Sequence, residues 1–226
     1  MNRIILDTEA VNSNTANPLI YDLSFIVFND DGVIDERGWV IDDIFNCRKD
    51  LFGSNYYKQK LIAYFKAIEN NTYEIKTIQD AYVTFADCCE NYNIQEVWAY
   101  NCDFDVRALN STLAYGSNGF CNRFIPATVK KKCVMGAAMS TICDSANYAK
   151  GVQRTTNGNI KVDAQSVYRY ISSDYDFVEK HIGLEDCKIE LAILKACLKR
   201  RKKMDTEPQP IFCFDSWQSL QRRFTN

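Results

Sequence analysis

The chain of 226 residues is long enough to bury a sizeable core, and its 46% hydrophobic and 25% charged residues are typical of a soluble globular protein. Its 13% aromatic residues argue against disorder, and no apolar run approaches the ~20 residues that span a bilayer. The net charge of −2 provides no general attraction to phosphate, so binding of nucleic acid would need a local basic patch.

The first forty or so residues predict three consecutive strands. Residues 3–7 form a short apolar run that ends in a carboxylate, and residues 19–28 are too rich in β-branched and aromatic side chains for a surface helix. Residues 29–32, Asn-Asp-Asp-Gly, are typical of a hairpin turn, after which residues 33–41 return as a third strand. We therefore expect the chain to open with a β-meander.

From residue 50 onward the apolar residues recur at the spacing of helices. A strand is predicted over residues 94–100, and helices are predicted over residues 56–68, 78–89, 104–113, 162–171 and 184–198. Strands followed by alternating helices and strands predict an α/β fold around a mixed sheet. We expect a single domain over residues 1–203 and a C-terminal tail, residues 204–226, that docks on it through aromatic side chains.

Cysteine use and the N-terminus predict a reducing compartment. None of the ten cysteines forms a CxxC pair, and with a single histidine the chain lacks the usual zinc patterns. The N-terminus reaches Asp7 too early for a signal peptide. The sequence therefore predicts reduced thiols and a cytoplasmic location, without a membrane partner.

Three acidic features lie at the ends of predicted elements. Asp7 and Glu9 close the first strand and project from the same face, because side chains alternate along a strand. Two such carboxylates repel each other unless a cation neutralises them, although a solvent-exposed strand end explains the same pattern. Asp105 lies near the start of a predicted helix, where helix capping is the competing explanation. His181, the one histidine of the chain, stands five residues before Asp186 at the last predicted helix.

Together and in this order, the three features resemble the motifs of the DEDDh exonucleases, the DnaQ-like 3′→5′ exonuclease family. That family combines a D-x-E strand end, an N-x-x-F-D turn and helix, and an H-x4-D helix start. The matching residues here are Asp7, Glu9, Asn101, Phe104, Asp105, His181 and Asp186. Ile182 stands where the tyrosine branch of the family has its tyrosine, so the chain resembles the histidine branch. The resemblance spans residues 4–197, and its later part looks like stand-alone exonucleases of bacteriophages and prophages.

The resemblance implies a ribonuclease H-like mixed sheet flanked by helices, with a site for two divalent cations, Mg²⁺ or Mn²⁺. Such a pair stabilises charge on the attacking and leaving oxygens of a phosphodiester. By this resemblance Asp7 bridges both ions, Glu9 and Asp186 complete the first site, and Asp105 acts on the second. His181 is then the general base, a role that suits an ordinary imidazole pKa near 6.5.

The resemblance also implies an activity, the release of nucleoside 5′-monophosphates from the 3′ end of single-stranded nucleic acid, with DNA favoured over RNA. The alternatives are an exoribonuclease or oligoribonuclease of the same fold, and a non-catalytic nucleic-acid-binding or polymerase-associated module. Any proofreading role would require a polymerase or replication partner in trans. A phage origin would place the protein in the cytoplasm of a host bacterium.

Candidate contacts with nucleic acid lie in and around these motifs. The candidates are Thr8, Ala10, Asn101 and Phe104, with Tyr100 as a second stacking candidate and the basic runs 130–132 and 199–203 for the phosphate backbone. Substrate preference is not carried over from the family, because Ala10-Val11-Asn12 replaces the Thr-Thr-Gly that often follows its D-x-E motif. Residues 46–70 are a candidate helical insert over the active-site side, with plain packing as the alternative.

Overall fold

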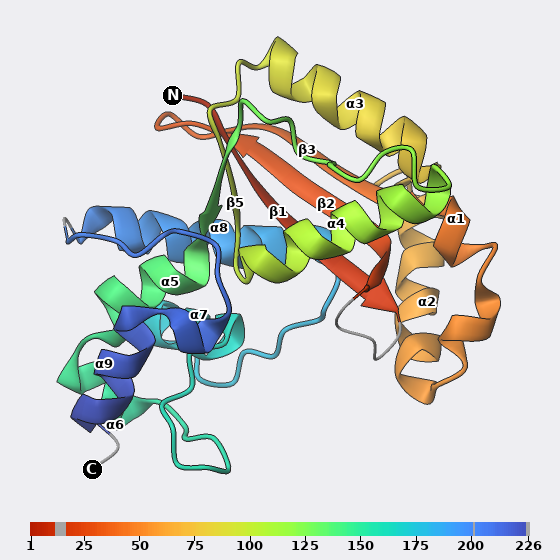
Figure 1. Cartoon of the computed structure of the whole chain (residues 1–226). Helices are drawn as coiled ribbons and strands as arrows, with labels where there is room; N and C mark the ends of the chain where they lie inside the picture. Colours follow the sequence, from red (N-terminus) through yellow and green to blue (C-terminus); the bar gives the residue numbers. More distant parts are fainter. Residues whose placement is uncertain (12–16, 201, 225–226) are drawn as a thin grey trace. The chain divides into compact units, whose positions relative to one another are not determined.

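The three strands predicted at the start of the chain are β1 (Arg3–Val11), β2 (Leu19–Phe28) and β3 (Val33–Ile41). In the computed structural model, which describes residues 1–11, 17–200 and 202–224, they pair as an antiparallel meander and lie side by side (Figure 1). The predicted bounds of β2 and β3 are confirmed. β1 runs beyond its predicted end at Asp7, because its pairing with β2 continues as far as Val11.

The meander is part of a six-stranded sheet in the order β4-β3-β2-β1-β5-β6. β4 (Glu74–Lys76) pairs in parallel with β3, so the sheet is mixed, as predicted. β5 (Glu96–Ala99) lies within the predicted strand at 94–100. β6 (Lys130–Cys133) contains the basic run 130–132, which the sequence pattern did not identify as a strand.

The five predicted helices are present, with ends that differ from the prediction by three residues or fewer: α2 (Asn55–Glu69), α3 (Ile78–Asn91), α4 (Cys102–Gly116), α7 (Ala164–Ser172) and α8 (Gly183–Lys199). The structure also contains shorter elements that were not predicted: α1 (Asp42–Phe45), α5 (Val134–Ala138), α6 (Ala146–Gly151), α9 (Asp215–Phe224), 3₁₀ turns at Lys49–Phe52 and Ile211–Cys213, and a π-helical turn at Met139–Cys143. Most of them are too short to develop a helical period.

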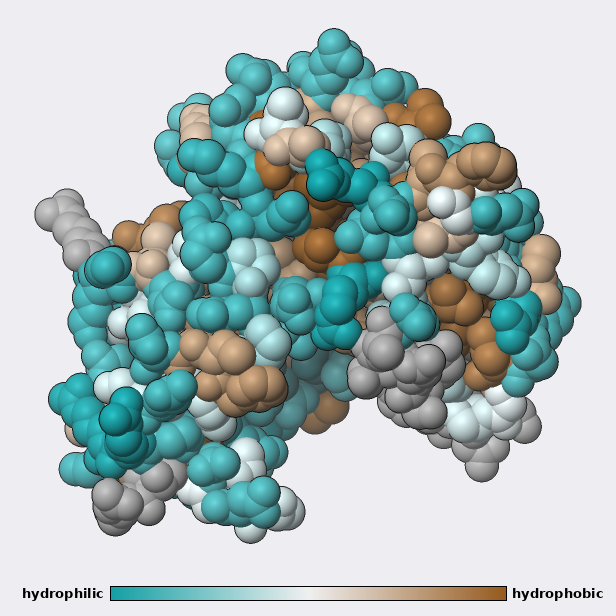
Figure 2. Space-filling model, viewed as in Figure 1, coloured by the Kyte–Doolittle hydropathy of each residue, from teal (hydrophilic) through white to brown (hydrophobic). Residues whose placement is uncertain are grey.

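β2 is the most deeply buried strand of the meander. Every residue from Ile20 to Phe28 is buried, so the strand is covered on both faces. Two of these residues, Asp22 and Ser24, are polar and fully buried. Many apolar side chains elsewhere in the chain are buried as well, although some, such as Phe120 at 91% exposure, are not. The visible face of the molecule is mostly hydrophilic (Figure 2). A buried polar pair in the central strand requires hydrogen-bond partners, and these partners lie beside the candidate site.

The chain forms two compact units. The first comprises Met1–Val97, Phe104–Lys130 and His181–Cys187, and the second comprises Trp98–Asp103, Lys131–Lys180 and Lys188–Asn226. The first unit contains all five residues that the sequence analysis expected to form the catalytic centre. In the second unit Phe214 is buried against Gly136, whereas the Phe212 side chain is 66% exposed.

The structure contains no disulfide among the ten cysteines, all of which are described. Within the described residues, no helix combines the length and the apolar character that crossing a membrane requires.

Candidate metal centre

β1 presents the first acidic pair as its alternation predicts. Thr8 is buried, while Asp7 and Glu9 on either side of it are half-buried, so the two carboxylates share the other face of the strand. The register with β2 shifts between Glu9 and Ala10, which marks a bulge directly after the acidic pair. Bulges re-aim side chains near functional sites, and this one shifts the register after Glu9, before the pairing resumes at Ala10.

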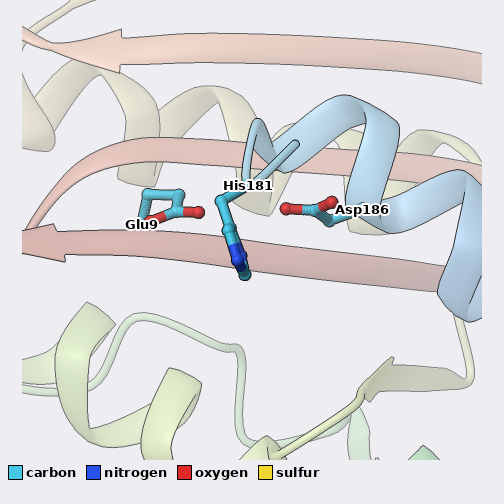
Figure 3. Close-up of side chains that lie close together, drawn as sticks. All are labelled: Glu9, His181 and Asp186. Atoms are coloured by element: carbon cyan, nitrogen blue, oxygen red, sulfur yellow. The ribbon is translucent and has the colours of Figure 1, made fainter. Parts of the chain in front are cut away.

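Glu9, His181 and Asp186 come together in space. Each offers one ligand atom, and these atoms all lie within 4.8 Å of one another. The two carboxyl groups point toward each other from β1 and α8, with the His181 side chain between them (Figure 3). Two carboxylates and an imidazole are a donor set that suits a divalent cation, with the oxygens favouring Mg²⁺ or Mn²⁺. These three residues therefore fit a divalent cation.

Asp7 and Asp105 have different surroundings. Among the described residues, neither belongs to the group of three. Asp105 is buried in the first turn of α4 and accepts a hydrogen bond from Thr8 Oγ1 at 2.8 Å. Burial raises the pKa of Asp105 to about 7, although the Thr8 hydrogen bond acts in the opposite direction. The Thr8 hydroxyl therefore links the Asp105 carboxyl to β1, at the residue that stands between Asp7 and Glu9 in the sequence.

Gly183 determines how α8 begins. Its N–H donates a hydrogen bond to Asp22 Oδ2 at 3.0 Å, and the N–H of Leu184 donates to Tyr73 Oη at 2.9 Å. A Cβ at position 183 would lie 2.7 Å from Asp22 Oδ2 and 2.8 Å from Ser24 Oγ, which is too close for a side chain. Glycine thus lets the backbone reach β2, and the helix that follows carries Asp186 in its first turn.

His181, two residues before this glycine, has a backbone conformation that residues other than glycine rarely adopt. Its φ angle is 54°, in the left-handed region. Such a conformation costs about 1 kcal/mol or more in a residue other than glycine, asparagine or aspartate, and it persists where surrounding contacts impose it. The two backbone hydrogen bonds at the start of α8 are contacts of this kind. They hold the chain to β2 and to Tyr73 within three residues of His181.

Asp22 is a residue of the site region that the sequence analysis missed. Its carboxylate accepts hydrogen bonds from Ser24 Oγ at 2.7 Å, from the Tyr64 hydroxyl, from Tyr73 Oη at 3.3 Å and from the Gly183 backbone. Burial raises the pKa of Asp22 to about 7, with these hydrogen bonds acting in the opposite direction. A carboxylate inside an otherwise apolar strand was the signal in the sequence that could have identified it.

We expect Asp22→Asn to flatten the dependence of stability on pH. The folded protein retains the Asp22 proton up to about pH 7, whereas the unfolded chain releases it near the ordinary pKa of 3.8. The contribution of Asp22 to the free energy of unfolding therefore decreases as pH rises between these values, by up to about 1.4 kcal/mol per pH unit. Urea unfolding of both proteins between pH 4 and pH 8, in EDTA, measures the difference.

The matched control for this substitution is Asp31→Asn, which removes one carboxylate from an exposed turn. It should leave the slope of the wild-type curve unchanged. Equal slopes for wild type and Asp22→Asn between pH 4 and pH 7 would contradict the raised pKa of Asp22.

Lys60 is the second residue of the site that the sequence analysis missed. It extends from α2, inside the segment 46–70, and its Nζ lies 2.9 Å from Glu9 Oε2 in an ion pair. Burial lowers the pKa of His181, and the positive charge of Lys60 lowers it further, while Glu9 acts in the opposite direction. A single lysine in a helical segment carries no pattern that would have singled it out.

The other candidate contacts with nucleic acid have diverse surroundings. Ala10 is half-buried, Asn101 is exposed in the second unit, and Phe104 is half-buried with the Arg107 guanidinium 6.0 Å from its ring centroid. Tyr100 is buried, and its hydroxyl donates to the Val162 carbonyl, so packing explains it better than stacking on a base. Asn12 lies outside the described residues, as does Arg201 of the basic run 199–203.

Solved structures with a similar fold include exonuclease I and cell-death related nuclease 4. Product-bound exonuclease I has a TM-score of 0.59 and 12% identity, covering 88% of this chain and 44% of that one. Exonuclease I of E. coli in complex with a dA16 oligonucleotide has a TM-score of 0.54 and 12% identity, covering 88% and 41%. Cell-death related nuclease 4 has a TM-score of 0.56 and 12% identity, covering 91% and 66%.

These similarities confirm the expected α/β fold of the ribonuclease H-like type. The chain spans less than half the length of the exonuclease I chains and 66% of cell-death related nuclease 4. No protein-family model matches the sequence, and no curated protein does.

Proposed function

We propose that the protein is a metal-dependent 3′→5′ exonuclease of the DEDDh type. In this proposal it shortens single-stranded nucleic acid, with DNA favoured over RNA, and releases nucleoside 5′-monophosphates. The observation that carries the proposal is the convergence of Glu9, His181 and Asp186 within a fold that exonuclease I shares. The five motif residues stand in the order and spacing of the family, and all five belong to one compact unit.

The proposed mechanism assigns a role to each residue of the site. Bound divalent cations, Mg²⁺ or Mn²⁺, supply the positive charge that stabilises the attacking and leaving oxygens. Glu9 and Asp186 would hold the first ion, Asp7 would bridge the two, and Asp105 would act toward the second. Asp105 would do so as an anion, the form that its Thr8 hydrogen bond favours, although burial raises the pKa of Asp105 to about 7.

His181 is the general base of this mechanism. Its imidazole takes a proton from the attacking water, and for this it must be neutral. The lowered pKa of His181 favours this neutral form. The charge of Lys60 that contributes to this shift therefore supports the assigned role.

The direct test uses 5′-labelled single-stranded DNA and RNA of one sequence, each with Mg²⁺, Mn²⁺ or EDTA. We expect a metal-dependent ladder that shortens from the 3′ end, and Asp7→Ala should lack it, which excludes a contaminating nuclease. The nucleic acid that is cleaved faster identifies the substrate class. Failure of the folded protein to cleave either substrate with metal present would contradict the proposal and favour a non-catalytic binding module.

The wider setting follows from the same proposal. Residues 1–203 would form the catalytic domain, with residues 204–226 packed on it and residues 46–70 as an insert beside the centre. The enzyme would work in the cytoplasm as a stand-alone exonuclease of the phage type, with any polymerase or replication partner acting in trans. Addition of a purified polymerase to the ladder assay tests the last point, because a partner in trans should change the rate of shortening.

A further inference from the structure

We propose that Lys60 is a built-in cation of the metal centre, which competes with the divalent ion for Glu9 and so sets the metal concentration at which the centre fills. This inference rests on the proposed function, because it takes Glu9 as a metal ligand. It assigns to α2 a part in regulating that centre.

The contact between Lys60 and Glu9 is close and shielded from water. Nζ of Lys60 lies 2.9 Å from Oε2 of Glu9, and the two side chains are 8% and 15% exposed. Lysine is rarely buried unless it is paired. Screening by water and salt is weaker at such a position than on the surface, so the charge of Lys60 acts strongly on the Glu9 carboxylate.

Lys60 is held in place by its neighbours on the same helix face. Tyr57 and Tyr64 lie three residues before and four residues after it, which places all three side chains on one face of α2. The Tyr57 hydroxyl donates to the Ala10 carbonyl at 3.4 Å, and the Tyr64 hydroxyl donates to Asp22. Polar contacts with β1 and β2 thus flank the ion pair on both sides. These contacts fix the position of α2, so that the Lys60 ammonium lies beside Glu9.

A divalent ion that binds to Glu9 meets this ammonium at the same carboxylate. The ligand atoms of Glu9, His181 and Asp186 lie within 4.8 Å of one another, so an ion among them would be close to Lys60 as well. The ion must either displace Lys60 from Oε2 or share the carboxylate with a like charge, and both lower its affinity. Lys60 also neutralises one of the two carboxylates before any metal arrives. All three effects have the same sign.

The test measures Mn²⁺ binding to the full-length protein by calorimetry, independently of nuclease activity. Lys60→Met is expected to bind Mn²⁺ about tenfold more tightly than wild type, because it removes the competing charge. Lys66→Met is the matched control, since Lys66 is an exposed lysine on the same helix, and it should bind like wild type. Lys60→Arg keeps the charge and should also stay near the wild-type affinity.

A double-mutant cycle separates competition from a merely structural role. In a Glu9→Gln background the Lys60→Met substitution should lose most of its effect on Mn²⁺ affinity, because the shared carboxylate is gone. A purely structural Lys60 would give a less stable protein whose Mn²⁺ affinity is unchanged or weaker. An unchanged or a weaker Mn²⁺ affinity of the folded Lys60→Met protein would overturn the inference.

The Mn²⁺ measurements distinguish failure of the inference on Lys60 from failure of the proposed function. If wild type binds Mn²⁺ and cleaves nucleic acid while Lys60→Met binds no tighter, the inference on Lys60 is wrong and the proposed function stands. If wild type and Lys60→Met both bind no Mn²⁺, both proposals are wrong. Circular dichroism checks that each variant is folded. Lys60→Gln serves in the same test if Lys60→Met unfolds, because its amide still donates a hydrogen bond but carries no charge.

Discussion

Asp186→Asn is expected to remove metal-dependent cleavage almost completely. The substitution keeps the size and the position of the side chain in the first turn of α8 but removes its negative charge beside Glu9. We expect Mn²⁺ affinity to fall at least about 10²-fold, because even outer-shell partners of metal ligands cost up to that much. The cleavage rate should fall by about 10³-fold or more, since transition-state charge then lacks its compensating cation.

The control for this substitution is Glu185→Gln, on the preceding residue of the same helix. Glu185 is exposed and is not part of the group formed by Glu9, His181 and Asp186. It should change neither Mn²⁺ affinity, measured by calorimetry, nor the rate of shortening of a labelled oligonucleotide. Asp186→Asn with wild-type Mn²⁺ affinity would show that the metal centre is assigned to the wrong carboxylate.

His181→Ala is expected to slow cleavage by about 10²–10⁴-fold while Mn²⁺ and nucleic acid still bind. In wild type the rate depends on neutral His181, so activity should be lost as pH falls through its pKa. Since burial and Lys60 lower that pKa, the loss should occur below the ordinary value of 6.5. This limb of the pH profile should be absent in the residual activity of His181→Ala.

Calorimetry with Mn²⁺ distinguishes the two roles that the geometry allows for His181. A general base can be removed with little loss of metal affinity, whereas a ligand cannot. If His181→Ala loses as much Mn²⁺ affinity as Asp186→Asn, His181 is a ligand and the assignment as base is wrong. Wild-type cleavage by a clean preparation of His181→Ala would contradict both roles.

Local patterns in the sequence were sufficient for much of the fold. The β-branched and aromatic run in residues 19–28 and the hairpin turn before residues 33–41 predicted β2 and β3 at their observed bounds, because both signals are local to the chain. The long helices α3 and α8 were likewise evident from their apolar period. Short elements such as β6 and α5 lacked a sufficient run of residues to show either period.

The sequence by itself also determined the candidate ligands, because each belongs to a short motif whose residue types and spacing can be read along the chain. Only the tertiary structure decided that Glu9, His181 and Asp186 form the close group, while Asp105 connects to β1 through Thr8. Only the tertiary structure, too, showed that Lys60 and Asp22 lie beside the site. Lys60 meets Glu9 across 51 residues, and Gly183 meets Asp22 across 161. Such contacts leave no local period, since they arise when separate strands and helices pack together and bring buried charges within reach of their partners.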